Sequence, residues 1–106
     1  MATKPKSGNG RAVVISTEHR GVFFGYASDD AIAAWEKDTT ASVKLDRCRM
    51  CLYWPASQRG FPGLVFDGPK EGARVSPAAT LTLAGITSIG DATPASIDRW
   101  ESAPWK

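Results

Sequence analysis

The sequence predicts a small, mainly β domain (α+β), in which an antiparallel sheet or small barrel is followed by a C-terminal helix. Short stretches rich in β-branched and aromatic residues come first, and the clearest helix-start signal comes near the end of the chain. This order excludes a Rossmann-type parallel sheet, in which strands and helices alternate. The 106 residues are 42% hydrophobic and 23% charged, a composition typical of a folded domain.

The first two strands are predicted at residues 12–17 and 22–27, where they form a hairpin. Both stretches are short and rich in β-branched or aromatic residues, and Gly21 ends a four-residue turn between them. Because side chains alternate along a strand, the second strand has two faces of different composition. One face holds Val22, Phe24 and Tyr26, and the other holds Phe23, Gly25 and Ala27.

Residues 28–40 allow two interpretations. Ser28, followed by two acidic residues, can cap a short helix that carries Ile32 and Trp35. A long loop anchored by Trp35 is the alternative.

Residues 42–54 form the longest predicted strand, and their apolar residues change parity. Val43 and Leu45 share one face, but the next apolar residues do not continue that alternation. A strand cannot bury both sets on one face without an extra residue, so a bulge or sharp bend is predicted near Asp46 and Arg47. Beyond the bend, one face is predicted to hold Cys48, Met50, Leu52 and Trp54, and the other Arg47, Arg49, Cys51 and Tyr53.

The remaining elements follow a turn-rich stretch. Residues 55–77 are rich in Gly and Pro and are predicted to form turns around two short apolar pieces. Residues 80–89 return to strand, with a bend at Gly85. Thr93 as N-cap, with Pro94 at the first helical position, predicts the C-terminal helix. Strand, turn, strand, loop and bent strand is also the order of SH3-like and Sm-like barrels.

The positive charge is concentrated at the start of the chain. The net charge is +2, and Lys4, Lys6 and Arg11 occur before any acidic residue; without these three, 10 basic and 11 acidic residues remain, a charge of −1. Residues 1–11 are predicted to be a flexible basic arm and residues 12–106 a single β-rich domain. The arm is either a solvated tail or a segment that reaches nucleic acid or a neighbouring subunit. The near-neutral body is not typical of a duplex-DNA binder, and no apolar run is long enough for a transmembrane helix.

The sequence contains no recognisable catalytic or metal-binding constellation. Cys48 and Cys51 have CxxC spacing, but a strand would hold their Cα atoms roughly 10 Å apart on opposite faces, too far for a disulfide. A zinc site needs four ligands, and the chain offers two Cys and one His. That histidine, His19, has no partner base or nucleophile at a known spacing. We therefore expect free thiols, no metal, no cofactor and no enzymatic activity.

Candidate binding residues lie on the longest strand and in the loop that precedes the next one. Two guanidinium groups beside one aromatic ring suit a phosphate or carboxylate group joined to a flat group. Solvated arginines over a sheet are the alternative. The stretch 68–76 resembles a phosphate loop without its Gly-Lys-Ser/Thr ending. Its backbone N–H groups and Arg74 could hold an anion, but tight-turn chemistry alone explains such a stretch more often. The predicted binding residues are Arg47, Arg49, Tyr53, Arg74 and Ser76.

Four tryptophans are many for a domain of this size to bury. We expect Trp35, Trp54 and Trp105 at a subunit interface. Open strand edges also favour self-association, so a dimer or small ring is predicted.

Five blocks occur in the order HRGVFFGY, RMCLYW, GLVFDGPKEGARVSPA, LTLAGIT and WESAPW, and the likeness that they carry covers about residues 18–105. Together they resemble an uncharacterised family of small proteins encoded by tailed phages and prophages. The resemblance implies a viral accessory protein in the host bacterial cytoplasm, and it assigns no catalytic or binding residue.

We therefore expect a phage-encoded, non-enzymatic binding protein. As an accessory or anti-defence factor it would occupy a host protein or sequester an anionic small-molecule signal. A capsid-associated structural protein of the virion is the first alternative. An Sm-like barrel that binds nucleic acid is the second.

Overall fold

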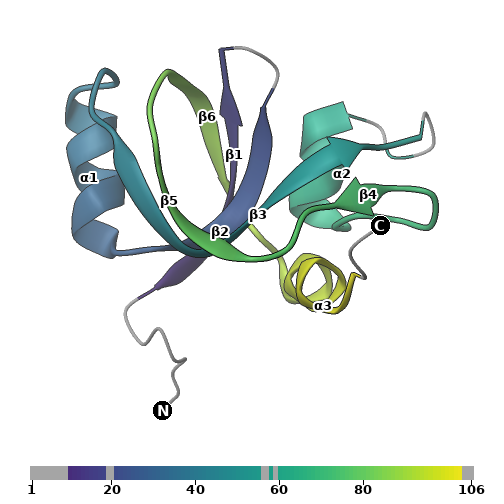
Figure 1. Cartoon of the computed structure of the whole chain (residues 1–106). Helices are drawn as coiled ribbons and strands as arrows, with labels where there is room; N and C mark the ends of the chain where they lie inside the picture. The colour runs from purple at the N-terminus through teal and green to yellow at the C-terminus, as the bar shows by residue number, and fades with distance from the viewer. Residues whose placement is uncertain (1–9, 19–20, 56–57, 59, 104–106) are drawn as a thin grey trace.

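The structure is a computed structural model that describes residues 10–18, 21–55, 58 and 60–103. Within these residues it contains one six-stranded antiparallel sheet and three helices (Figure 1). In chain order the elements are β1 (Arg11–Thr17), β2 (Val22–Ala27), α1 (Asp29–Lys37), β3 (Val43–Tyr53), α2 (Gly60–Phe66), β4 (Arg74–Val75), β5 (Ala79–Leu83), β6 (Ile86–Asp91) and α3 (Pro94–Ser102).

The sheet follows the order β4-β3-β2-β1-β6, and β5 also pairs with β3. The long strand β3 contacts β2 along one edge and, in succession, β5 and β4 along the other. Ala84 and Gly85 join β5 to β6, but these two strands pair with β3 and β1 and not with each other. The predicted mainly β fold with a C-terminal helix is therefore confirmed as an open sheet, and the closed-barrel form is not observed.

The bend predicted in β3 is present as a bulge. The register against β2 shifts between the pairs Phe24↔Arg49 and Tyr26↔Asp46, and the register against β5 shifts over the same stretch. Arg47 lies at the bulge with a φ of 50°, a left-handed conformation that is uncommon for a non-glycine residue. The parity change in the sequence thus located the bulge correctly.

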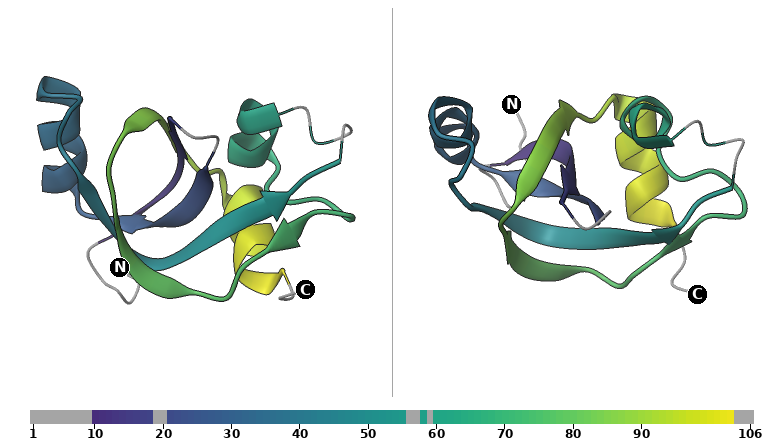
Figure 2. Two further views of the ribbon diagram at one scale, coloured as in Figure 1. Left: turned by 45° about the horizontal axis from the view of Figure 1, so that its top comes forward. Right: turned by 90° about the horizontal axis from the view of Figure 1, so that it is seen from above.

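The β1–β2 hairpin separates two hydrophobic cores. Figure 2 shows α1 on one side of the sheet and α2 with α3 on the other. Alternate residues of each strand enter opposite cores, as the predicted two faces of β2 require. The buried residues of the first core, beneath α1, are Val13, Ile15, Ala27, Ile32, Val43, Leu45, Cys48, Leu83 and Ile86. Those of the second core, beneath α2 and α3, are Val14, Val22, Phe24, Tyr26, Cys51, Leu64, Val75 and Trp100.

Two helices begin where the sequence predicts. Residues 29–37 adopt the helical interpretation, and the Ser28 Oγ accepts a hydrogen bond from the backbone N–H of Ala31 at 3.1 Å. Thr93 caps α3 in the same way by accepting from the N–H of Ser96 at 3.1 Å. Both side chains satisfy an N–H group that the first helical turn leaves without a partner.

The short helix α2 was not predicted, because its sequence GFPGLVF reads as a turn. Pro62 lies in the first turn, where the missing N–H costs no intrahelical bond. Leu64 is fully buried in the second core and makes this unfavourable sequence helical by tertiary packing.

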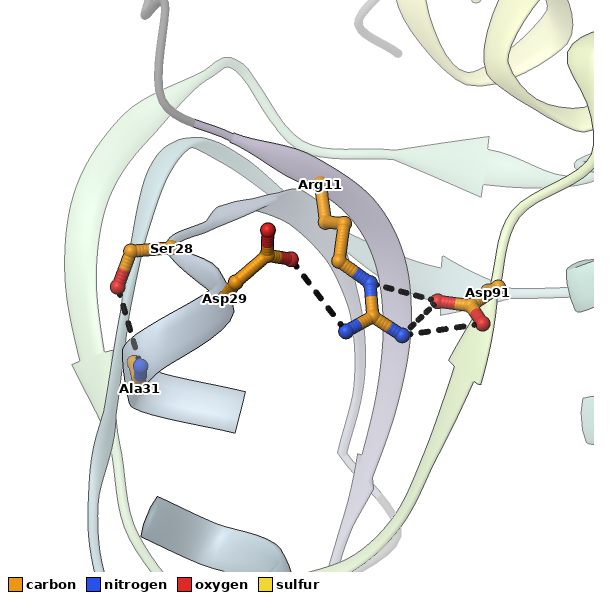
Figure 3. A network of polar contacts seen from close by, with 5 residues as sticks. All are labelled: Arg11, Ser28, Asp29, Ala31 and Asp91. Atoms are coloured by element: carbon orange, nitrogen blue, oxygen red, sulfur yellow. Dashed lines mark hydrogen bonds and ion pairs between the residues drawn. The ribbon is translucent and has the colours of Figure 1, made fainter. Parts of the chain in front are cut away.

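Arg11 belongs to β1 and not to the predicted arm, whose residues 1–9 lie outside the described part of the chain. Its guanidinium donates to both carboxylate oxygens of Asp91 on β6, at 2.9 and 3.1 Å, and contacts Asp29 of α1 at 3.5 Å (Figure 3). The predicted arm therefore loses one of its three cations to a structural contact. No helix in the described residues is long and apolar enough to cross a membrane.

Candidate anion-binding site

The loop between α2 and β4 is held in place by a buried side chain, that of Gln58. Gln58 is fully buried, and both ends of its amide bond to the loop. The Nε2 donates to the Gly68 carbonyl at 2.6 Å, and the Oε1 accepts from the N–H of Lys70 at 2.9 Å. The loop backbone is thus fixed before any ligand arrives.

Gly68 brings the same loop against α3. It has a φ of +78°, and a Cβ at this position would lie 2.8 Å from the Ser96 carbonyl oxygen and 2.9 Å from the Cβ of Arg99. Any other residue would be both strained and in collision with helix backbone. Because the loop and α3 lie so close together here, a depression forms between them, with the loop as one wall and α3 as the other.

An open depression of about 1030 Å³ lies between the loop and the end of α3. Its volume is at the upper end of the range usual for small-molecule sites. The residues that line it are Pro69, Lys70, Glu71, Gly72, Ala73, Arg74, Arg99, Ser102 and Ala103.

The depression is electropositive. Among the described residues that line it, three are basic and one is acidic. Lys70 lies 3.6 Å from Asp67. Within the described part of the chain, neither the Arg74 nor the Arg99 guanidinium makes a hydrogen bond or ion pair, and the Arg99 side chain is exposed. In a chain with almost balanced charge, these two groups create a local field that attracts anions.

Arg49 differs from the prediction, because it is buried beneath α3 rather than exposed on a sheet. Only 9% of its surface is accessible. It donates to the carbonyls of Trp100 at 2.6 Å, Ala103 at 2.7 Å and Ser76 at 2.8 Å. Two of these acceptors belong to the end of α3, whose last carbonyls have no intrahelical donor and carry partial negative charge. Burial lowers the pKa of the guanidinium from its ordinary value, and Arg49 caps a helix instead of facing solvent.

Arg47 is half exposed and already paired. Its Nη2 lies 2.5 Å from Glu101 of α3, and the guanidinium carbon lies 4.6 Å from the centre of the Tyr26 ring. The Tyr26 hydroxyl also donates to Glu101. Burial, followed by the neighbouring carboxylate, raises the pKa of Tyr26 to about 12, so the phenol stays protonated at neutral pH. A second depression, of about 260 Å³, is lined by Phe24, Arg47, Arg49, Ala78 and Glu101.

The five predicted binding residues are therefore not brought to one site. Arg74 lines the larger depression and the two strand arginines line the smaller one. Tyr53 is 56% exposed and is the cross-strand neighbour of Arg74. Ser76 is structural, because its Oγ accepts from the N–H of Met50 at 2.9 Å. The prediction missed Arg99, and no local pattern places a helical arginine beside a loop that begins some thirty residues earlier.

The tryptophans predicted at an interface are partly used inside the molecule. Trp35 packs against the first core and Trp54 against the second, and both are half-buried. In the described residues the indole N–H of Trp35 finds no acceptor. Trp105 and His19 lie outside the described residues.

The two cysteines are free and buried in different cores. Burial raises the pKa of Cys48 to about 12 and, opposed only by a hydrogen bond to the Tyr53 backbone, that of Cys51 to about 11. Neither thiol is a thiolate at neutral pH, and thiolates are the reactive form. Among the residues described, no three His, Cys, Asp or Glu side chains come together as a metal site would require.

Two comparisons with known proteins bear on this chain. The model of a family described as a domain of unknown function, DUF6948, matches residues 10–100. That span contains every element of the fold except the last two residues of α3. A search of curated proteins finds no match.

Proposed function

The chain belongs to the DUF6948 family, and we propose that it is a non-enzymatic protein that binds an anionic small molecule in the depression between the 69–74 loop and α3. The observation that carries the proposal is the contrast among the arginines. Three arginines are bound to acceptors within the protein, namely Arg11, Arg47 and Arg49. In the part of the chain that the structure describes, the two that lack such acceptors, Arg74 and Arg99, line the same depression.

A phosphate or carboxylate ligand fits this arrangement. Guanidinium groups bind both kinds of oxyanion with paired, charge-assisted hydrogen bonds. The loop that forms one wall of the depression is held by Gln58 and by the close approach of Gly68 to α3, so little conformational entropy is lost when a ligand binds. Because α3 ends in the depression, its terminal carbonyls would repel an anion, and Arg49 offsets that repulsion from beneath.

The lining residues favour binding over catalysis. Among the described residues that line the depression, the one carboxylate is that of Glu71, and the one hydroxyl, on Ser102, donates to the Asp98 carbonyl at 2.7 Å. A nucleophile activated by a neighbouring base would require a different pair of groups. We further propose that the protein is encoded by a phage or prophage and acts as an accessory factor in the host cytoplasm, as the blocks described above suggest.

The test is an NMR titration of the protein with inorganic phosphate, citrate and AMP, with uncharged adenosine as the neutral comparison. We expect amide shifts concentrated at residues 69–74 and 99–103 for the anions and none for adenosine. Arg74→Ala and Arg99→Ala should each weaken binding about tenfold or more, because each removes a charge-assisted contact. The melting temperature should change little, since neither side chain has a partner among the described residues.

Lys37→Ala is the matched control. Lys37 is an exposed cation in the last turn of α1, outside the depression, so its loss changes the net charge equally. If Lys37→Ala weakens binding as much as the arginine variants, the protein attracts anions only through its overall charge. If no anion produces localised shifts, the proposed site is wrong.

A further inference from the structure

One edge of the sheet is open along β5. This strand pairs with β3 through Val43↔Leu83 and Leu45↔Leu81, and in the described residues no strand pairs with its other edge. Figure 2 shows β5 and β4 along one margin of the sheet, outside β3. Residues 77–82 are all exposed. The outward N–H and C=O groups of β5 are thus available to another strand.

Strand β5 has neither charged side chains nor proline, two of the features that commonly blunt a sheet edge. The bulge beside it has its extra residue in β3 and not in β5. Residues 75–90 contain no Asp, Glu, Lys, Arg or His, and the strand itself, Ala79–Leu83, has the sequence ATLTL. Threonine has a high strand propensity. Pro77 precedes the strand and Gly85 follows it, so neither interrupts its edge.

We propose that β5 pairs antiparallel with β5 of a second copy of this chain, about a twofold axis at Leu81. An uncharged strand meets no like-charge repulsion from an identical strand, and isologous contacts of this kind build most homodimers. Leu81 is 40% exposed, although its cross-strand neighbour Leu45 is fully buried. In the dimer, Leu81 of each copy faces Leu81 of the other, which extends the apolar row Leu45–Leu81 across the axis.

This pairing is independent of the proposed anion site. No residue of β5 lines the larger depression, so the larger depression of each copy remains open to ligand in the dimer. The contact is short, because β5 has five residues, and we expect a dimer that dissociates on dilution in the micromolar range.

Sedimentation equilibrium measures this association directly. The wild-type chain should approach twice its mass of 11.3 kDa as its concentration rises. Leu81→Lys should remain monomeric, because it places two ammonium groups opposite each other at the axis. Ser88→Lys, an exposed position on β6 in the same uncharged stretch, is the matched control and should still dimerise. Circular dichroism melting of each variant establishes that it is folded.

Cross-linking tests the register without a charge. Residues opposite each other across an antiparallel pair have Cα atoms about 4.5–5.5 Å apart, within disulfide range. Leu81→Cys should therefore form a covalent dimer under mild oxidation. Thr82→Cys should not, because the two copies of residue 82 are offset by two positions and lie roughly 8 Å apart. Cys48 and Cys51 are buried and do not compete.

Three results would overturn the proposal. The first is a wild-type chain that stays at the monomer mass at several hundred micromolar. The second is a folded Leu81→Lys variant that dimerises as strongly as wild type. The third is cross-linking by Thr82→Cys in preference to Leu81→Cys.

Discussion

The two cores of this molecule are held in different ways. The buried residues of the first core are apolar apart from the Cys48 thiol, and the indole N–H of Trp35, which packs against this core, has no acceptor among the described residues. Its helix α1 follows β2 almost directly, with the N-cap supplied by the intervening Ser28. The second core is covered by α3, which arrives much later in the chain, and it contains buried polar contacts. Ser96 donates to the Leu64 carbonyl at 2.8 Å, and Arg49 binds the last carbonyls of the same helix.

The difference teaches how a late helix finds one orientation on a sheet. Apolar contacts are not directional, so a helix with a short connection can rely on them. A helix that returns over a long distance is fixed more sharply by hydrogen bonds at defined atoms, because a misplaced helix would leave those atoms buried without partners. The second core therefore depends on single polar residues in a way that the first does not.

Removing Arg49 should have the largest effect on stability, because the second core depends on its hydrogen bonds. Arg49→Met keeps the aliphatic stem but leaves the carbonyls at the end of α3 without donors. We expect the free energy of unfolding to fall by about 3 kcal/mol or more, measured by urea denaturation. Arg47→Ala, which removes a half-exposed ion pair, should cost less than about 1 kcal/mol. Equal effects of the two changes would show that Arg49 does not hold the helix.

Gly68→Ala should have the second-largest effect. The new Cβ would collide with the backbone of Ser96, and the φ of +78° would be strained as well. Gly72→Ala introduces a similar backbone strain at a φ of +98°, but its Cβ would come no closer than 3.5 Å to Pro55. We expect a loss of stability of about 1 kcal/mol for Gly72→Ala and about 3 kcal/mol for Gly68→Ala, from thermal or urea unfolding. Equal losses would mean that the loop does not rest on α3.

The smallest expected effect concerns the two cysteines, which test the two cores separately because each core contains one of them. Burial raises the pKa of Cys48 to about 12 and of Cys51 to about 11, whereas an unfolded thiol titrates near 9. Above pH 9 the unfolded chain therefore loses protons that the native chain keeps, and the free energy of unfolding falls as pH rises toward 11–12. Each thiol can contribute at most about 1.4 kcal/mol per pH unit, and nothing below about pH 8.

In a variant with both cysteines changed to Ala, the free energy of unfolding should fall much less between pH 9 and 10 than it does in the wild-type chain. In the Arg49→Met background, alkylation at pH 8 followed by mass spectrometry should modify Cys51 before Cys48, because only the second core has been loosened. Modification of both at the same rate would mean that the two cores unfold together.

Local sequence patterns were sufficient for much of this fold. Alternation located both faces of β2, and the change of parity located the bulge at Arg47. Ser28 and Thr93 marked the helix starts, because a cap bonds to an N–H only three residues away. Each of these signals depends on neighbours in the chain.

The features that local patterns could not predict depend on distant residues. Arg49 looked exposed because alternation cannot show that α3 covers its face of the sheet. Helix α2 forms although its sequence favours a turn, since Leu64 is buried against elements elsewhere in the chain. Arg99 and Arg74 come to line the same depression only after the loop and the helix have docked. The spacing of residues in the sequence therefore cannot predict candidate sites that combine separate elements.

The pairing of β1 with β6 also determines when the molecule can assemble during synthesis. Val13 pairs with Asp91, so the first strand acquires its second neighbour only after β6, residues Ile86–Asp91, has been made. Until then the hairpin β1–β2 has apolar side chains on both faces and only β3 beside it. Contacts between such distant residues slow folding because a long loop must close before they form. Helix α1 can cover the face toward the first core early, but the free edge of β1 and the face toward the second core stay uncovered until the later elements are made, and chaperones would act on the hairpin at that stage.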